Sequence, residues 1–286
     1  MKKIIIAILT LSMTLGILSG CGSKNKTEVT PPPKGTTTDS TGNKEKPVVV
    51  TPGTELSDFM SKYTDTKTKV WDEMSKKFDE ESNPSFAMGA LGFAFADLAI
   101  VDILFFDTLT EKDGVTFKGK LMFTGIDAWK TVKGDIIEFG YDFTNLEDKN
   151  QSKNGDKSVA KGKFDKSKNS LIYERSTERS GKVMDKYVVE ITRNSDISYS
   201  SQIYFLDSSS NEGVDKNQLT GYLTWFDDKG IISYLVEKDI PDVNLSYNSI
   251  YGKKNIKPEE MAKGSTVTMK TSYIDGKSLF EQLDSN

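Results

Sequence analysis

Apolar and polar residues alternate with a period of two from residue 113 onward, and no other feature restricts the fold of this chain as much. The alternation is clearest at residues 115–123, 137–143 and 187–191, and similar segments lie at residues 171–173, 203–206, 219–226, 231–236 and 266–273. Turn signals rich in Gly, Asp, Asn and Lys separate these segments, at residues 133–135, 165–169, 180–182 and 227–230. Strands with one apolar face and short connections form antiparallel meanders. Glycines inside several strands mark bends. The pattern therefore predicts a long, curved antiparallel sheet over residues 113–275.

Residues 86–106 form the second informative stretch, because they are apolar nearly all round a helix. Asp97 and Asp102 are their only charged residues, and at 3.6 residues per turn these two acids lie about 140° apart. A membrane span is disfavoured, since a central Asp costs ~2.5–3.5 kcal/mol. A helix that is hydrophobic on all sides is normally buried. We therefore expect a buried, apolar helix held by the sheet.

Small residues, including Gly89 and Gly92, keep the first half of this helix thin. Two explanations fit. Small residues let strands approach closely, which agrees with the dense packing of protein cores. Alternatively, they leave a cavity for an apolar ligand, with Asp97 or Asp102 at its polar end. The two acids also fit a helix cap and a paired buried carboxylate. The candidate cavity residues are Gly89, Gly92, Asp97 and Asp102.

Residues 54–81 precede this stretch and have apolar side chains at helical spacing, as in Leu56, Phe59 and Tyr63. The spacing predicts one amphipathic helix, or two with a break near Thr66. Helices over residues 54–109 followed by a sheet over residues 113–275 give an α+β fold. We expect residues 54–286 to form a single domain, with the N-terminal helices packed against a curved meander or half-barrel.

Residues 22–53 are rich in Lys, Thr, Ser, Gly and Pro and contain three consecutive prolines at residues 31–33. Almost no apolar residue precedes Val48, so this segment cannot bury enough surface to fold. A flexible chain of this length spans ~30 Å on average. We interpret it as a disordered linker.

The first 21 residues have the pattern of an export signal. Lys2 and Lys3 precede an apolar run over residues 4–17, and Leu18-Ser19-Gly20-Cys21 follows. The run is short for a membrane span, which needs ~20 apolar residues. This pattern resembles the lipobox of bacterial lipoproteins. The resemblance implies a signal peptide over residues 1–20, lipid attachment to Cys21, and a location on the extracytoplasmic face of the cell membrane. The abundance of Lys, Asn and Ile is similar to that of low-GC Gram-positive lipoproteins.

The composition excludes several functional classes. The chain of 286 residues has no histidine, which removes Ser-His-Asp and Cys-His catalysis and histidine-bound metals. Its single cysteine cannot form an internal disulfide. The net charge is −4 and the charges are interspersed, so a nucleic-acid partner is not expected. Asp165, Ser167 and Asn169 begin like a calcium loop, but Ser170 and Ser176 replace its glycine and its glutamate. A turn explains them better, and we expect no metal, cofactor or catalytic residue.

The order of helices and meander looks similar to envelope lipoproteins in which a half-barrel wraps over helices, a group that carries lipids or lipoproteins. This likeness rests on architecture and transfers no residue. We expect a non-enzymatic, membrane-anchored protein that binds an apolar or envelope-derived ligand. Two alternatives are an envelope scaffold that binds a protein partner and, less favoured, a hydrolase using two carboxylates.

Overall fold

The computed structural model describes residues 55–78, 84–121, 124–144, 155–211, 214–243 and 267–283. They all belong to one compact unit, Thr51–Asn286. The signal segment, Cys21 and the linker lie outside the described residues. Within the described ranges, no helix is both long enough and apolar enough to cross a membrane.

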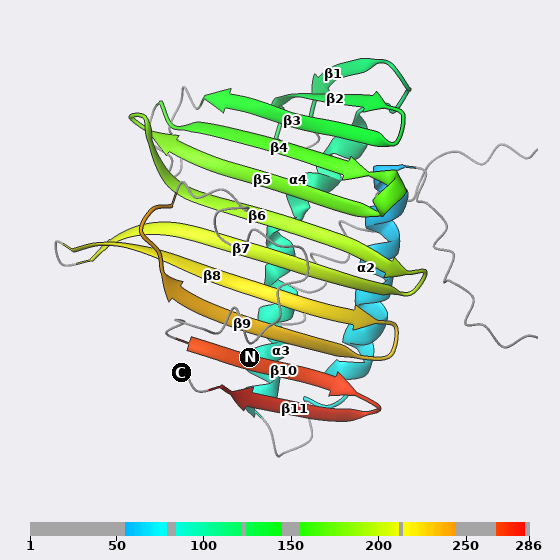
Figure 1. The fold of residues 1–286 in the computed structure, drawn as a ribbon, viewed down its shortest axis with the longest axis vertical. Coiled ribbons are helices and arrows are strands. Elements are labelled where there is room, and N and C mark those ends of the chain that lie inside the picture. Colours follow the sequence, from blue (N-terminus) through cyan, green and yellow to red (C-terminus); the bar gives the residue numbers. More distant parts are fainter. Residues whose placement is uncertain are drawn as a thin grey trace, which may run out of the picture. The chain divides into compact units, whose positions relative to one another are not determined.

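Eleven strands among the described residues form one antiparallel sheet, in which each strand pairs with the next strand in sequence (Figure 1). They are β1 (Thr116–Lys120), β2 (Asp127–Lys133), β3 (Ile136–Thr144), β4 (Lys157–Asp165), β5 (Ser170–Arg179), β6 (Lys182–Ser195), β7 (Ser198–Asn211), β8 (Val214–Asp227), β9 (Ile231–Asp239), β10 (Val267–Ile274) and β11 (Lys277–Gln282). With the helices described next, the sheet gives an α+β fold. The predicted fold class and antiparallel meander are confirmed.

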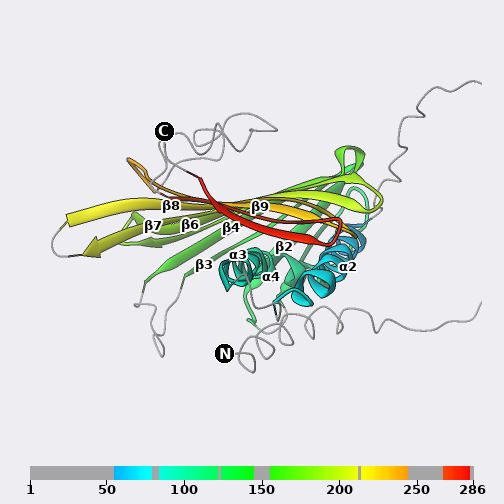
Figure 2. The same ribbon diagram turned by 90° about the horizontal axis from the view of Figure 1, so that it is seen from below.

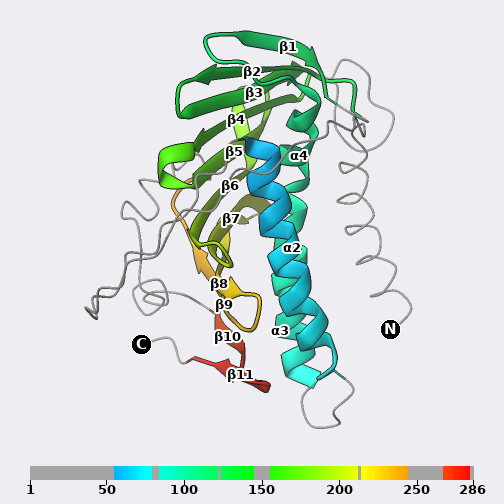
Figure 3. The ribbon, with the colours of Figure 1, turned by 90° about the vertical axis from the view of Figure 1, so that its right-hand side faces the viewer.

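The helices all lie against one face of the sheet (Figures 2 and 3). The amphipathic segment forms α2 (Leu56–Ser75). The apolar stretch is not one helix but four consecutive segments: α3 (Pro84–Phe95), the 3-10 helix η1 (Ala96–Ala99), α4 (Val101–Leu104) and the 3-10 helix η2 (Phe105–Thr108). Lys67 of α2 donates from Nζ to the carbonyl oxygen of Phe93 at 2.8 Å. This bond satisfies an acceptor near the end of α3, where helical carbonyls lack partners.

The apolar stretch is only partly buried, in contrast to the sequence expectation. Phe86, Ala90 and Phe93 are buried on the side that faces the core. Met88 is 67% exposed and Leu98 is 59% exposed. The sheet lies on one side of these helices, so their outer side is not covered by any described element.

Aromatic rings fill the space between the helices and the sheet. The ring centroids of Phe106 and Phe139 are 4.6 Å apart, and those of Phe93 and Phe226 are 5.8 Å apart. Gly162 makes room for Phe139, because a Cβ at this glycine would lie 2.1 Å from Cζ of the ring. The strand glycine therefore accommodates a ring from the neighbouring strand.

A second apolar cluster lies on the face of the sheet that points away from the helices. Its buried members are Val188, Tyr204, Leu206, Leu219, Leu223, Val236 and Val243. Ile240 and Val243 follow β9, so residues 240–243 pack against the outer face. The central strands are thus apolar on both faces, which a simple two-residue alternation does not predict.

Three parts of the sheet differ from expectation. β2 was missed because Lys130, buried at 1% exposure, occupies one of its inward positions and interrupts the apolar alternation. β11 lies beyond the predicted end of the sheet at residue 275. Residues 207–215 are polar apart from Gly213 and Val214 and carry no apolar alternation, yet the pairing of β7 with β8 continues to Asn211 and Val214. Backbone pairing extends there past the apolar core, so polar residues occupy strand positions.

Candidate functional site

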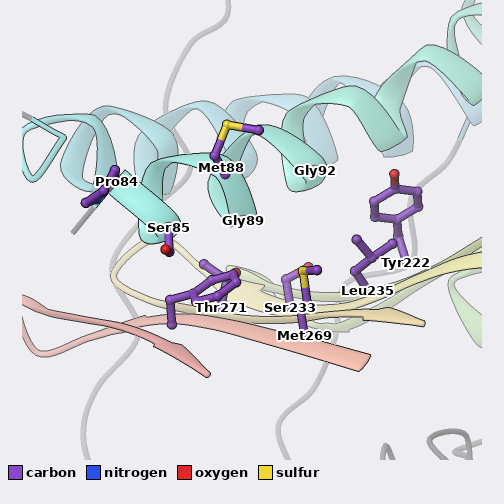
Figure 4. A pocket seen from close by; sticks show the side chains of 11 residues that line it. Pro84, Ser85, Met88, Gly89, Gly92, Tyr222, Ser233, Leu235, Met269 and Thr271 are labelled. Carbon is purple, nitrogen blue, oxygen red and sulfur yellow. The ribbon is translucent and has the colours of Figure 1, made fainter. Parts of the chain in front are cut away.

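A pocket of about 420 Å³ lies between the first turns of α3 and strands β8 to β11 (Figure 4). We call it the α3 pocket. Gly89 and Gly92 line it from the helix, and the strands contribute Tyr222, Leu235, Ser233, Met269, Thr271 and Phe280. Met88, at its edge, is largely exposed. Most of the lining is apolar, and the volume falls in the range typical of small-molecule sites.

The two glycines fix how closely α3 approaches the sheet. A Cβ at Gly89 would lie 1.9 Å from Oγ1 of Thr271, so even alanine requires a shift of the helix or the strand. A Cβ at Gly92 would lie 3.2 Å from Cε1 of Tyr222, which is tight but close to an ordinary contact. Gly89 is therefore required for close packing, whereas Gly92 faces the space that the pocket leaves open.

Polar groups are few in the pocket. Ser233 shares a hydrogen bond of 3.1 Å with Thr224, between the two hydroxyl oxygens. The hydroxyl of Tyr222 makes no hydrogen bond to any described residue. Burial, and then the negative charge of Glu237, raises the pKa of Tyr222. The phenol is thus protonated at neutral pH and is available to donate to a ligand.

A second group of polar side chains surrounds Asp102 in α4, and we call it the Asp102 cluster. Oδ2 of Asp102 accepts hydrogen bonds from the hydroxyls of Tyr187 at 2.6 Å, Tyr173 at 3.3 Å and Tyr141 at 3.5 Å. Nη1 of Arg175 donates to the same oxygen at 3.0 Å and to the hydroxyl of Tyr187 at 3.3 Å. The Asp102 side chain is 22% exposed and that of Arg175 is 33% exposed. Four donors from three strands therefore hold one half-buried carboxylate.

The surroundings keep these phenols protonated. Burial raises the pKa of Tyr187 and of Tyr141 above the ordinary value, and the nearby charge of Asp102 raises both further. The pKa of Tyr173 is raised by burial and by its neighbours Tyr187 and Asp102. A protonated phenol next to a carboxylate acts as a donor. The cluster therefore holds the Asp102 carboxylate through hydrogen bonds from protonated phenols and from Arg175.

The predicted site residues separate into three groups. Gly89 and Gly92 line the α3 pocket. Asp102 does not line it but lies over β3, β5 and β6, where it has the paired-carboxylate arrangement that was one of its two interpretations. The side chain of Asp97 and the whole of Cys21 lie outside the described residues.

Sequence reasoning missed Arg175 and the tyrosines around it. The only signal was an arginine at an inward position of β5, two residues after the inward-facing Tyr173.

Asp165, Ser167 and Asn169 form the turn that their composition predicted. Oδ1 of Asp165 accepts from Oγ of Ser167 at 2.7 Å, and this bond contributes most to lowering the pKa of Asp165 to about 2. Within the described part of the chain, no group of three or more carboxylates could hold a metal ion.

No family model, curated protein or solved structure matches this chain. The α3 pocket and the Asp102 cluster therefore carry the functional interpretation.

Proposed function

We propose that this chain is a non-enzymatic lipoprotein, anchored to the extracytoplasmic face of the cell membrane through lipid on Cys21, that binds an apolar ligand in the α3 pocket. The pocket itself carries the binding part of the proposal. It has the volume of a ligand site, about 420 Å³, and a lining that is mostly apolar. The lipobox-like Leu18-Ser19-Gly20-Cys21 and the apolar run before it support the anchor.

The lining suggests how such a ligand is held. Leu235, Met269 and Phe280 offer apolar contacts from the strands, and Gly92 gives the ligand room beside the helix. Methionine side chains adapt their shape to a bound group, and Met88 at the edge of the pocket is exposed. We also propose that the sheet curls around the helices as a half-barrel, since the helices occupy one face only and Gly140 and Gly162 occur within paired strands.

Native mass spectrometry of the chain from residue 21 onward, carrying Cys21→Ser so that no lipid is attached, tests the binding. We expect an adduct that dissociates on denaturation and extracts into organic solvent. Gly92→Leu fills the pocket and should reduce the adduct severalfold. Ala87→Leu adds a side chain to the same helix away from the pocket lining and should leave the adduct unchanged. A bare protein mass, together with no uptake of an apolar fluorophore, would contradict the proposal.

The anchor is tested separately in cells. Cys21→Ser in the full chain should release the protein from membranes or leave an uncleaved precursor. Normal cleavage with unchanged membrane retention would contradict lipid attachment to Cys21. Because the anchor and the pocket are tested by different variants, either part of the proposal can fail alone.

A second function, binding of an envelope protein, is favoured by one observation. Met88 and Leu98 are the two most exposed large apolar residues among those described, and both lie on the apolar stretch. Met88 belongs to α3 and Leu98 to η1, and exposed apolar residues along one such stretch are typical of interaction surfaces. Leu98→Gln should abolish crosslinking to such a partner without changing the ligand adduct. Gly92→Leu should reduce the ligand adduct without changing the crosslinking.

A further inference from the structure

We infer that the ligand of the α3 pocket is an amphiphile with an anionic head, whose oxyanion binds Arg175 while its hydrocarbon chain runs along α3 into the pocket. This inference rests on the proposed function and specifies the class of its ligand. Three observations carry it: the hydrogen bonding of Arg175, the aromatic row between Arg175 and the pocket, and the charges around the row.

Arg175 uses only one of its nitrogens in the Asp102 cluster. Nη1 donates to both Asp102 and Tyr187. Nε is buried and has no hydrogen-bond partner, and Nη2 donates to no described residue. A buried polar atom without a partner requires an explanation, such as a water or a ligand atom. The Nε–Nη2 edge of a guanidinium matches the paired oxygens of a carboxylate or phosphate. This edge is left without a partner, and because Nε is buried, an oxyanion approaches it from the Nη2 side of the one-third exposed side chain.

A row of aromatic rings joins Arg175 to the pocket. The guanidinium lies 5.4 Å from the ring centroid of Tyr187. Successive ring centroids are 6.1 Å apart from Tyr187 to Phe205 and 6.0 Å apart from Phe205 to Tyr222, which lines the pocket. The row crosses β5, β6, β7 and β8, a distance of about 14 Å at ~4.8 Å per strand.

The row is accessible. Tyr187, Phe205 and Tyr222 are each half-buried, so part of each side chain is exposed. The helices contact the row at its two ends, α4 at Tyr187 and α3 at Tyr222. A hydrocarbon chain lying on these rings covers apolar surface over its whole length. Its far end then enters the pocket beside Gly92.

The charges near the row set how strongly the head is held. Asp102 neutralises part of the Arg175 charge. Asp185 and Asp207 lie opposite each other on β6 and β7, each two residues along its strand from Tyr187 and Phe205 of the row. These three carboxylates oppose an anionic head, so removal of the Asp102 charge should strengthen its binding. Because weakened folding cannot produce tighter binding, this expected gain separates a ligand role for Arg175 from a purely structural one.

The test compares ligands of equal chain length on the chain from residue 21 onward with Cys21→Ser, by calorimetry or fluorophore displacement. Palmitate should bind about tenfold more tightly than hexadecanol, which lacks the charge. Octanoate, which is too short to reach from Arg175 into the pocket, should bind weakly. Lysophosphatidate with a palmitoyl chain distinguishes the head groups. Tighter binding than palmitate would identify a phosphate head, and weaker binding would identify a carboxylate head. Either result supports the inference.

Variants assign the preference to Arg175. Asp102→Asn should strengthen palmitate binding severalfold and leave hexadecanol unchanged, and Arg175→Gln should bring palmitate to the hexadecanol level. Lys161→Gln, which removes a positive charge from the other face of the sheet, should change neither. Equal binding of palmitate and hexadecanol, with both weakened by Gly92→Leu, would overturn the anionic head and keep the pocket. No effect of Gly92→Leu on either ligand would overturn both.

Discussion

The apolar stretch lies on the same face of the sheet along its whole length, yet its two ends are held in different ways. At the α3 end, Gly89 and Gly92 bring the helix close to β8–β11 and leave a pocket. At the α4 end, four polar donors hold the carboxylate of Asp102. Apolar contacts specify distance but not direction, whereas a converging set of hydrogen bonds fixes one position. The polar end is thus fixed in place, and the apolar end retains space that a ligand can use.

The largest stability effect should come from removing Asp102. Asp102→Ala leaves the half-buried Arg175 and three tyrosine hydroxyls without their shared acceptor, which should lower the free energy of unfolding by about 2–3 kcal/mol. Urea denaturation of the chain from residue 21 onward measures this change. Asp127→Ala, which removes a carboxylate from an exposed pair with Lys120, should have no measurable effect. Equal effects of the two variants would mean that the α4 end is held by apolar contacts.

The Asp102 cluster shows where sequence reasoning stops. A lone acid in an apolar stretch predicts a paired carboxylate, and the pairing found for Asp102 agrees with that. Its partners could not be found, because Tyr141, Tyr173 and Tyr187 look in the sequence like ordinary inward residues of alternating strands. Which strands lie beneath the end of the helix depends on the arrangement of the whole sheet. No local pattern contains that information.

A smaller effect should distinguish the two glycines of the pocket. Alanine is favoured over glycine in a helix by about 1 kcal/mol. At Gly89 the contact with Thr271 outweighs this gain, so Gly89→Ala should lower the free energy of unfolding by about 1–2 kcal/mol, as measured by urea denaturation. Gly92→Ala should be neutral or slightly stabilising. The double variant Gly89→Ala with Thr271→Ala should be more stable than the two single effects predict, because the clashing oxygen is gone. Additive effects would mean that Oγ1 of Thr271 does not limit the approach of α3.

The meander itself was predictable because each strand carries its signal locally. The alternation of β3 and β6 and the turn at residues 165–169 needed no knowledge of distant residues. The break of the apolar stretch into α3, η1 and α4 was not predictable. It accompanies a contact between Lys67 and the carbonyl of Phe93, 26 residues away. Likewise, buried Lys130 concealed β2, since its ion pair with Glu111 at 3.1 Å becomes visible only in the fold.

The smallest predicted difference compares one tyrosine from each end. Tyr187→Phe removes the 2.6 Å bond to Asp102 and should lower the free energy of unfolding by about 1 kcal/mol at pH 7. Tyr222→Phe, in the pocket, should leave the free energy of unfolding at pH 7 unchanged.

The Tyr187 phenol should also be detectable through the pH dependence of stability at alkaline pH. Because burial and Asp102 raise the pKa of Tyr187 in the folded protein, its stabilising contribution is complete below the ordinary pKa of ~10 and is lost as the pH rises above it. Urea denaturation at pH 10 and 11 should therefore show a decline that Tyr187→Phe makes shallower, by about 1.4 kcal/mol per pH unit at most. A decline in Tyr187→Phe as steep as in the unsubstituted protein would mean that the fold does not keep the Tyr187 phenol protonated, and the contrast between a fixed and an open end would then rest on Arg175 alone.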